Sequence, residues 1–159
     1  MSRNWTADIA EMHQKFGTNK AIHSMDAKKL KAFLEFRVKF LDEELTEIKR
    51  ALEGYDKEGE LTSEEAADAV IDGCIDLCVV AIGTLDAFNV DAVEAWNRVH
   101  KANMAKEVGV KEGRPNPLGL PDLIKPKGWV APGHKDLVSG QLLLALETNE
   151  APPQFFHVD

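Results

Sequence analysis

Five carboxylates in two helix-like segments are the residues of this chain whose types and spacing could do chemistry. Glu43, Glu44 and Glu47 lie in the first segment, and Asp72 and Asp76 lie in the second. Asp76 has almost no other polar residue near it in the sequence. A carboxylate that is removed from water is strongly destabilised unless it is paired, neutralised or bound to a cation. Two helices that offer carboxylates to a shared core therefore suggest a divalent-metal site.

The spacing within each segment places its acids on one helix face. Glu44 and Glu47 are three residues apart and Asp72 and Asp76 are four apart, and both intervals bring side chains together. Ligation by carboxylate oxygens alone suits the hard cations Mg²⁺ and Mn²⁺, and Mg²⁺ favours a partner phosphate. For Glu43, Glu44 and Glu47 the alternative is an ordinary solvated helix face, and the apolar surroundings of Asp76 argue against it.

Other metal and phosphate sites lack their sequence signatures. A di-iron bundle would need Glu-x-x-His on two helices, and none of the five histidines has a glutamate three residues earlier. No Gly-x-x-x-x-Gly-Lys-Ser/Thr run of a P-loop occurs. Cys74 and Cys78 are the only cysteines and have no evident Cys or His partners for zinc. We expect both to be small core residues in a reducing cytoplasm.

Helical periodicity predicts four helices that would position the acids. The first covers residues 5–16 and is followed by a short loop to about Ser24. The second is long and ends near Gly54. The third begins at a cap formed by Thr62 or Ser63, with Glu65 or Glu64 as its capping-box partner, and runs to about Phe88. A tight turn at 89–91 leads into the fourth. Because this third helix becomes apolar on nearly all sides after its second turn, we expect it to lie at the centre of the assembly.

The fold class predicted from this pattern is all-α, with an irregular C-terminal third. Glycine and proline recur after residue 108, which makes a long helix there implausible, although a short one is expected within 136–147. The length suits a single domain over residues 1–159. Its helical core would cover about 5–108, with a Gly/Pro-rich loop and tail over 109–159.

The composition excludes several classes of partner. A net charge of −8 argues against general binding of nucleic acid or of an anionic membrane, since both reward clustered Lys and Arg. No apolar run is long enough to span a bilayer, and the first residues lack the apolar core of a secretory signal. We therefore expect a cytoplasmic protein without nucleic-acid or membrane partners.

The acidic segments resemble a family signature. Glu-Glu-x-x-Glu on one helix and an acidic pair on the next is similar to the all-α nucleoside triphosphate pyrophosphohydrolases of the MazG type, which include phosphoribosyl-ATP pyrophosphohydrolase. Further matches, spanning roughly residues 8 to 133, are Glu11-Met12-His13, Phe16-Gly17, Arg37, Ile82-Gly83-Thr84, 99–106 and 125–132. The later ones resemble a phage and bacterial branch. The common second motif, Glu-x-x-Asp, would put an acid at Gly73, whereas this chain has Asp72 one residue earlier.

The resemblance implies a helical bundle that hydrolyses the α–β phosphoanhydride of a nucleotide, releasing a monophosphate and pyrophosphate. It implies Mg²⁺, with Mn²⁺ as the alternative, and the metal ligands would be Glu44, Glu47, Asp72 and Asp76. The catalytic residues would be Glu43, Glu44, Glu47 and Asp76, with Glu43 orienting or deprotonating the attacking water. The family forms dimers or higher assemblies, so we expect a homodimer or homotetramer.

Six further residues are candidates for binding the nucleotide: Arg37, Lys101, Asn103, Lys106, Lys125 and Trp129. Arg37, Lys101 and Lys106 would bind the charged phosphate groups. Asn103 could form hydrogen bonds with the sugar or the base. Trp129 and Lys125 would form a lid or base-stacking wall. The alternatives are surface solvation for the basic residues and plain packing for Trp129, and His13 is expected to be a satisfied helix residue. The preferred base depends on pocket shape, and a non-catalytic metal-binding or interaction module is the alternative function.

Overall fold

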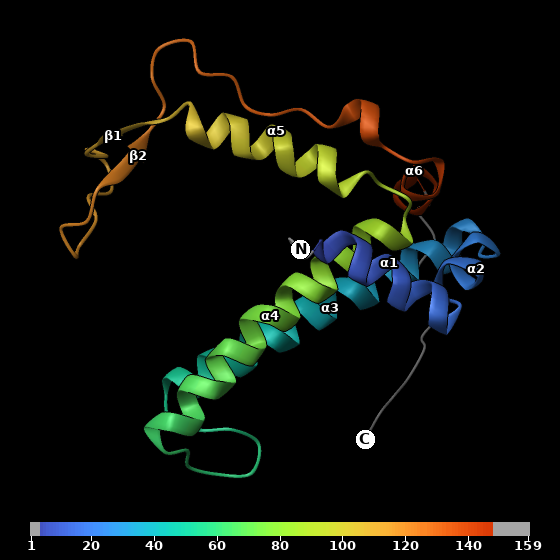
Figure 1. The fold of residues 1–159 in the computed structure, drawn as a ribbon, viewed down its shortest axis with the longest axis horizontal. Helices are drawn as coiled ribbons and strands as arrows, with labels where there is room; N and C mark the ends of the chain where they lie inside the picture. Colours follow the sequence, from blue (N-terminus) through green and yellow to red (C-terminus); the bar gives the residue numbers. More distant parts are fainter. Residues whose placement is uncertain (1–3, 148–159) are drawn as a thin grey trace. The chain divides into compact units, whose positions relative to one another are not determined.

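The structure is a computed structural model that describes residues 4–147. Over this range it contains six α-helices and a two-stranded antiparallel sheet, which confirms the predicted all-α class. None of the helices in this range is long and apolar enough to cross a membrane. The chain divides into two compact units, one formed by the residues up to 90 and from 138 onward, the other by residues 91–137 (Figure 1). That the whole chain forms one domain stays a prediction.

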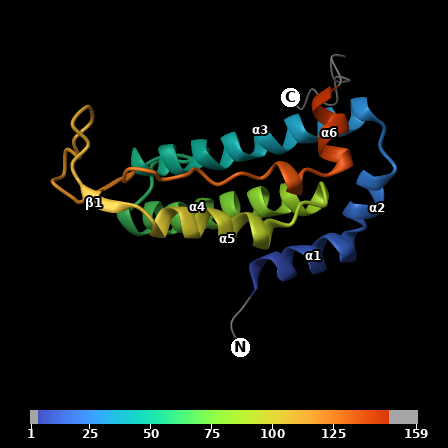
Figure 2. The same ribbon diagram turned by 90° about the horizontal axis from the view of Figure 1, so that it is seen from above.

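The first unit is built on a long antiparallel helical hairpin. It contains α1 (Trp5–Phe16), α2 (Thr18–His23), α3 (Ala27–Leu52), α4 (Ser63–Ala87) and α6 (Gly140–Glu147). In Figures 1 and 2, α3 and α4 run side by side along most of their length. Helix α1 packs against α4, and α6 packs against α3. The two acidic segments therefore lie on neighbouring helices of one hairpin.

Side-chain caps set the starts of the main helices. Asn4 and Asp26 accept hydrogen bonds from backbone N–H groups in the first turns of α1 and α3. Thr62 and Glu65 form the capping box at the start of α4 that the sequence predicted. Gly17 ends α1 in the left-handed conformation with φ of +70°, which a glycine adopts without strain.

The buried core of the first unit lies where α2, α3, α4 and α6 meet. It consists of Ile22, Leu30, Ala87, Phe88 and Ala145. The rings of Phe33 and Phe88 pack with their centroids 5.8 Å apart. Complete burial of one such large apolar side chain stabilises the fold by roughly 1.5–3 kcal/mol. This core fixes one end of the α3–α4 hairpin.

Much of the apolar surface farther along the hairpin is exposed. Leu52 on α3 and Ile71 on α4 are 75% and 65% exposed, and Leu45 and Ile75 are also exposed. Within one chain α4 is therefore partly uncovered, and its place at the centre of an assembly stays a prediction. Extended apolar patches on a folded surface are typical of interaction sites.

Three local features differ from the sequence prediction. Helix α2 occupies a stretch expected to be a loop, because Gly17 turns the chain and helix resumes at Thr18. A short ribbon of β1 (Glu107–Gly109) and β2 (Asp122–Ile124) lies in the region expected to be irregular. Cys74 is exposed and Cys78 is half-buried, so neither belongs to the core.

The second unit consists of α5 (Ala92–Met104), the β1–β2 ribbon and a 3₁₀ turn, η1 (Lys135–Leu137). The strands pair antiparallel, and the chain after β2 runs back along α5 (Figure 1). Asp91 caps α5 by accepting a hydrogen bond from the backbone N–H of Glu94.

Helices α1, α3 and α4 meet over Gly83. His13 on α1 is only 4% exposed, and its Nδ1 lies 2.6 Å from a carboxylate oxygen of Asp86 on α4. Because an ionised carboxylate only accepts hydrogen bonds, Nδ1 carries the proton. This contact agrees with the expectation that His13 is a satisfied helix residue.

Arg37 joins α3 to α4 beside His13. Its Nε donates to the hydroxyl of Thr84 at 3.0 Å, and its Nη2 donates to the backbone carbonyl of Val80 at 2.8 Å. A Cβ atom at Gly83 would lie 2.7 Å from this Nη2 and 3.3 Å from Nε2 of His13. Glycine therefore leaves the room that both polar side chains need.

We predict that Gly83→Ala lowers the free energy of unfolding by about 1 kcal/mol. The added methyl group crowds two hydrogen-bonded side chains, and this overpacking outweighs the better helix propensity of alanine. Urea denaturation would measure the change. Gly140→Ala is the matched control, because a Cβ at Gly140 in α6 meets nothing within 4 Å. Equal stability of the Gly83→Ala variant and its parent would contradict the close packing described above.

Candidate functional site

The acidic faces of α3 and α4 approach each other at Gly73. A Cβ atom at this buried position would lie 2.7 Å from Cγ1 of Ile48 and 3.6 Å from the backbone oxygen of Glu44. An acidic side chain at position 73 would therefore fit only if α4 and Ile48 of α3 moved apart. The close approach gives a physical reason why this chain carries its acid at Asp72 instead.

Glu44 lies at the centre of the carboxylate cluster. It is half-buried, and this burial is the largest cause that raises the pKa of its carboxyl above the usual value. Repulsion from four neighbouring carboxylates raises the pKa further: Asp76, Glu47, Asp72 and Glu43. The structure thus brings all five predicted acids into one electrostatic cluster.

Asp76 is less enclosed than its sequence surroundings suggested. It is half-buried, and the adjacent Ile75 on α4 is exposed. Glu47 and Asp72 are exposed. The single-chain structure therefore does not make Asp76 a fully buried charge.

The donor atoms of the cluster are of the type that binds a hard divalent cation. Carboxylate oxygens from two facing helices are the ligands that Mg²⁺ and Mn²⁺ prefer. Within residues 4–147, however, no three His, Cys, Asp or Glu side chains are gathered into a ready-made metal cluster.

A literal Glu-x-x-Asp also occurs at Glu65 and Asp68, but its glutamate has another role. Glu65 accepts hydrogen bonds from the backbone N–H and the hydroxyl of Thr62 at 2.8 and 2.7 Å, and these bonds lower its pKa. Among the acids of α4, Asp76 and Asp72 raise the pKa of Glu44 instead. The structure thus distinguishes the capping residue from the acids of the cluster.

Two lysines that sequence reasoning did not assign to the site reach the cluster. Lys57, in the connection between α3 and α4, donates to Oε1 of Glu47 at 2.7 Å. The ammonium of Lys39 lies 3.8 Å from Oε1 of Glu43. The i,i+4 spacing of the second pair is visible in the sequence, whereas the first depends on the shape of the connection.

Arg37, a predicted phosphate contact, is engaged with α4 through Nε and Nη2. Burial lowers the pKa of its guanidinium. In the structure Arg37 therefore joins two helices, and its contact with a nucleotide stays a prediction.

The remaining predicted binding residues lie in the second unit, near the C-terminal end of α5. The indole Nε1 of Trp129 donates to the backbone carbonyl of Ala102 at 2.7 Å. The ammonium groups of Lys125 and Lys106 lie 4.7 and 5.6 Å from the centroid of the Trp129 ring. Lys106 also donates to Oδ1 of Asn103 at 2.8 Å.

A cavity of about 460 Å³ lies beside this tryptophan. Trp129, Lys101 and Lys127 supply its aromatic and cationic lining, and Pro126 and Ala105 add apolar surface. This volume falls in the range of small-molecule sites, roughly 300–1,000 Å³. The predicted site residues are thus gathered in two groups, the acids in the first unit and the lysines with Trp129 in the second.

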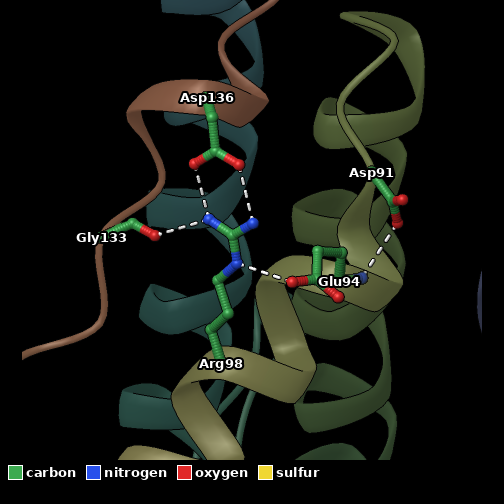
Figure 3. Close-up of polar contacts among 5 residues, drawn as sticks. All are labelled: Asp91, Glu94, Arg98, Gly133 and Asp136. Atoms are coloured by element: carbon green, nitrogen blue, oxygen red, sulfur yellow. Dashed lines mark hydrogen bonds and ion pairs between the residues drawn. The ribbon is translucent and has the colours of Figure 1, made fainter.

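Arg98 holds the returning segment against α5 (Figure 3). Its Nη1 and Nη2 donate to the two carboxylate oxygens of Asp136, both at 2.7 Å. Nη1 also donates to the carbonyl of Gly133 at 2.9 Å, and Nε donates to Glu94 at 2.7 Å. A guanidinium group suits such bidentate binding. Arg98 was not predicted from the sequence, although its i,i+4 spacing from Glu94 is visible there.

A family model described as phosphoribosyl-ATP pyrophosphohydrolase matches residues 9–103, more than half of the chain. The chain therefore belongs to the phosphoribosyl-ATP pyrophosphohydrolase family of the MazG-like superfamily, as its acidic motifs indicated. The match includes both acidic helices and most of α5, and it ends before Lys125 and Trp129. Comparison with curated proteins finds no match.

We predict that the carboxyl of Asp136 titrates at about 2 rather than at its ordinary 3.8, chiefly because Arg98 donates hydrogen bonds to its charged form. The depressed pKa means that this contact stabilises the folded chain above about pH 4. That stabilisation is lost as the pH falls toward 2. Carbon-13 NMR of the carboxyl group would measure the titration. In Arg98→Lys, which loses the planar two-point contact, the midpoint should rise, and a parent midpoint near 3.8 would contradict the geometry.

Proposed function

We propose that this protein is a Mg²⁺-dependent nucleotide pyrophosphohydrolase. It would cleave the α–β phosphoanhydride of a nucleoside or deoxynucleoside triphosphate and release a monophosphate and pyrophosphate. Family membership supports a hydrolase of the pyrophosphohydrolase type. The observation that carries the finer proposal is the carboxylate cluster around Glu44, in which two facing helices contribute acids that raise its pKa.

The acids of the cluster would divide into ligands and a water-orienting group. Glu44, Glu47, Asp72 and Asp76 would hold Mg²⁺, or Mn²⁺ in its place. The bound cation would supply neutralisation of phosphate charge and a fixed geometry for the attacking water, which are the main needs of this kind of transfer. Glu43, next to Glu44 on α3, would orient that water or accept its proton.

The lysine and tryptophan group of the second unit would bind the nucleotide. Lys101 and Lys106 would contact phosphate oxygens, and Asn103 would bond the sugar or base. Trp129, whose ring is fixed by the bond from its indole nitrogen, would stack on the base, with Lys125 beside it. The cavity next to this ring supports the assignment because it combines an aromatic wall with cationic side chains.

Arg37 would add a phosphate contact from the first unit. Two of its nitrogens bond to α4, which fixes the direction of the guanidinium. A fixed guanidinium loses little conformational freedom when it binds an anion. Its other N–H groups would face the phosphate.

We further propose a homodimer or homotetramer in the cytoplasm. The exposed apolar side chains of α3 and α4, Leu45, Leu52, Ile71 and Ile75, support association through this face. The two free cysteines, Cys74 and Cys78, agree with a reducing compartment.

We predict that the protein converts nucleoside triphosphates to monophosphate and pyrophosphate in the presence of Mg²⁺, and that a chelator abolishes this turnover. Ion-exchange chromatography of products from a panel of triphosphates would identify the bond that breaks. Asp76→Asn should eliminate turnover, because it removes one ligand charge. Asp68→Asn, one turn before Asp72 on the same helix, is the matched control and should retain activity. Release of orthophosphate and a diphosphate would overturn the proposed bond, and no turnover at all would favour a non-catalytic binding module.

The stability of the metal-free variant gives an independent readout. The pKa of Glu44 is higher in the folded state than in the unfolded state. The fold is therefore destabilised as the pH rises from the unfolded-state pKa through the folded-state pKa and Glu44 ionises. Asp76→Asn relieves part of the repulsion, so its metal-free form should melt at the same temperature as the parent or higher. Added Mg²⁺ should raise the melting temperature of the parent and do much less for the variant. Equal stabilisation of both proteins by Mg²⁺ would remove Asp76 from the ligand set.

We predict that the protein is a stable homo-oligomer in dilute solution, held together by the exposed face of α3 and α4. Multi-angle light scattering should report two or four times the chain mass of 17.6 kDa. Ile71→Glu should shift the population toward monomer, because a buried unpaired charge opposes association. Leu118→Glu, at a position that is also exposed but lies in the second unit, is the control. A parent protein that runs as a monomer would exclude this assembly.

A further inference from the structure

Lys57 contacts the carboxylate cluster of the first unit from the hydrogen-bonded turn between α3 and α4. Lys57 donates to Oε1 of Glu47 at 2.7 Å, although the two residues are ten positions apart. Both side chains are exposed, and Glu43 and Glu44 lie one turn before Glu47 on α3. A cation therefore lies where negative charge accumulates in the metal-free protein.

The connection between α3 and α4 is a tight turn that presents Lys57. The Asp56 carboxylate accepts hydrogen bonds from the backbone N–H groups of Glu58 and Gly59 at 2.7 and 2.9 Å. The backbone N–H of Asp56 donates to the carbonyl of Gly59 at 3.0 Å, and Tyr55 and Glu60 form an antiparallel bridge. The backbone N–H of Tyr55 also donates to the carbonyl of Arg50 in α3 at 3.0 Å, so hydrogen bonds set the position of the Lys57 backbone relative to α3.

Lys39 provides a comparison within the same cluster. Its ammonium lies 3.8 Å from Glu43, one turn along α3, and both side chains are largely exposed. Glu43 is the proposed water-orienting residue, whereas Glu47 is a proposed ligand. The ion pair of Lys57 therefore involves Glu47, a carboxylate that would bind the metal, whereas the ion pair of Lys39 does not involve a proposed ligand.

We propose that Lys57 is a further residue of the site, which pairs with Glu47 in the metal-free protein and releases it when Glu47 becomes a metal ligand. The inference rests on the proposed metal site. Lys57 would thus relieve repulsion in the empty cluster and compete with the divalent cation for one carboxylate. The turn between Tyr55 and Glu60 would keep the released ammonium near the cluster.

The test is the affinity of the metal-free protein for Mn²⁺, measured by electron paramagnetic resonance at low ionic strength. Lys57→Met removes the charge and keeps a chain of similar length, and it should lower the dissociation constant roughly threefold to fivefold, the size expected for an exposed ion pair. The gain should shrink at high salt. Lys57→Arg, which keeps the charge, should bind like the parent. Lys57→Gln repeats the measurement with a second neutral side chain.

Lys39→Met is the matched control, because it removes the same charge from the same cluster without involving a proposed ligand. Its affinity should change less than that of Lys57→Met. Equal or weaker Mn²⁺ binding by Lys57→Met, compared with Lys39→Met, would overturn the role of Lys57 while leaving the metal site intact. A parent that binds no Mn²⁺, or whose binding is unchanged by Asp76→Asn, would overturn the metal site and this inference together.

Discussion

The close contact between α3 and α4 is the constraint on which the candidate site depends. At Gly73 the helices approach so closely that a single added carbon would meet Ile48, and at Gly83 it would meet Arg37. The same approach brings the acids of the two helices within electrostatic reach of Glu44. Packing and charge are therefore opposed along this hairpin, since the contact that buries apolar surface also concentrates negative charge.

Different parts of the hairpin resolve this opposition in different ways. Near the core, Arg37 supplies a cation that is fixed by neutral oxygen atoms of α4. Nearer the far end, Lys57 reaches back to Glu47 from the turn. Between them the pKa of Glu44 is raised, first because its carboxyl is partly removed from water and then because four other carboxylates surround it. A divalent cation would have the largest electrostatic effect at this uncompensated position.

Local signals in the sequence sufficed for the main helices and for the position of the acids. The Thr62–Glu65 capping box and the i,i+3 and i,i+4 spacing of the acids act within a few residues, so they can be recognised without tertiary information. The contact of Lys57 with Glu47 depends on the closed turn between two helices, and the exposure of Ile71 depends on what packs beside α4. Such features arise from contacts between distant positions, which periodicity does not encode.

The Arg98 contact has a consequence for how this protein can diversify. Between α5 and α6 the chain forms a short ribbon and a 3₁₀ turn, and two contacts attach its returning segment to α5. Arg98 binds Asp136, and the indole of Trp129 donates to the carbonyl of Ala102. The family match ends at residue 103, before that segment begins. The stretch from β1 to these contacts belongs to the second unit and contains no residue of the α3–α4 hairpin. Changes to the ligand contacts proposed for this stretch can therefore arise without altering the sequence of the α3–α4 hairpin.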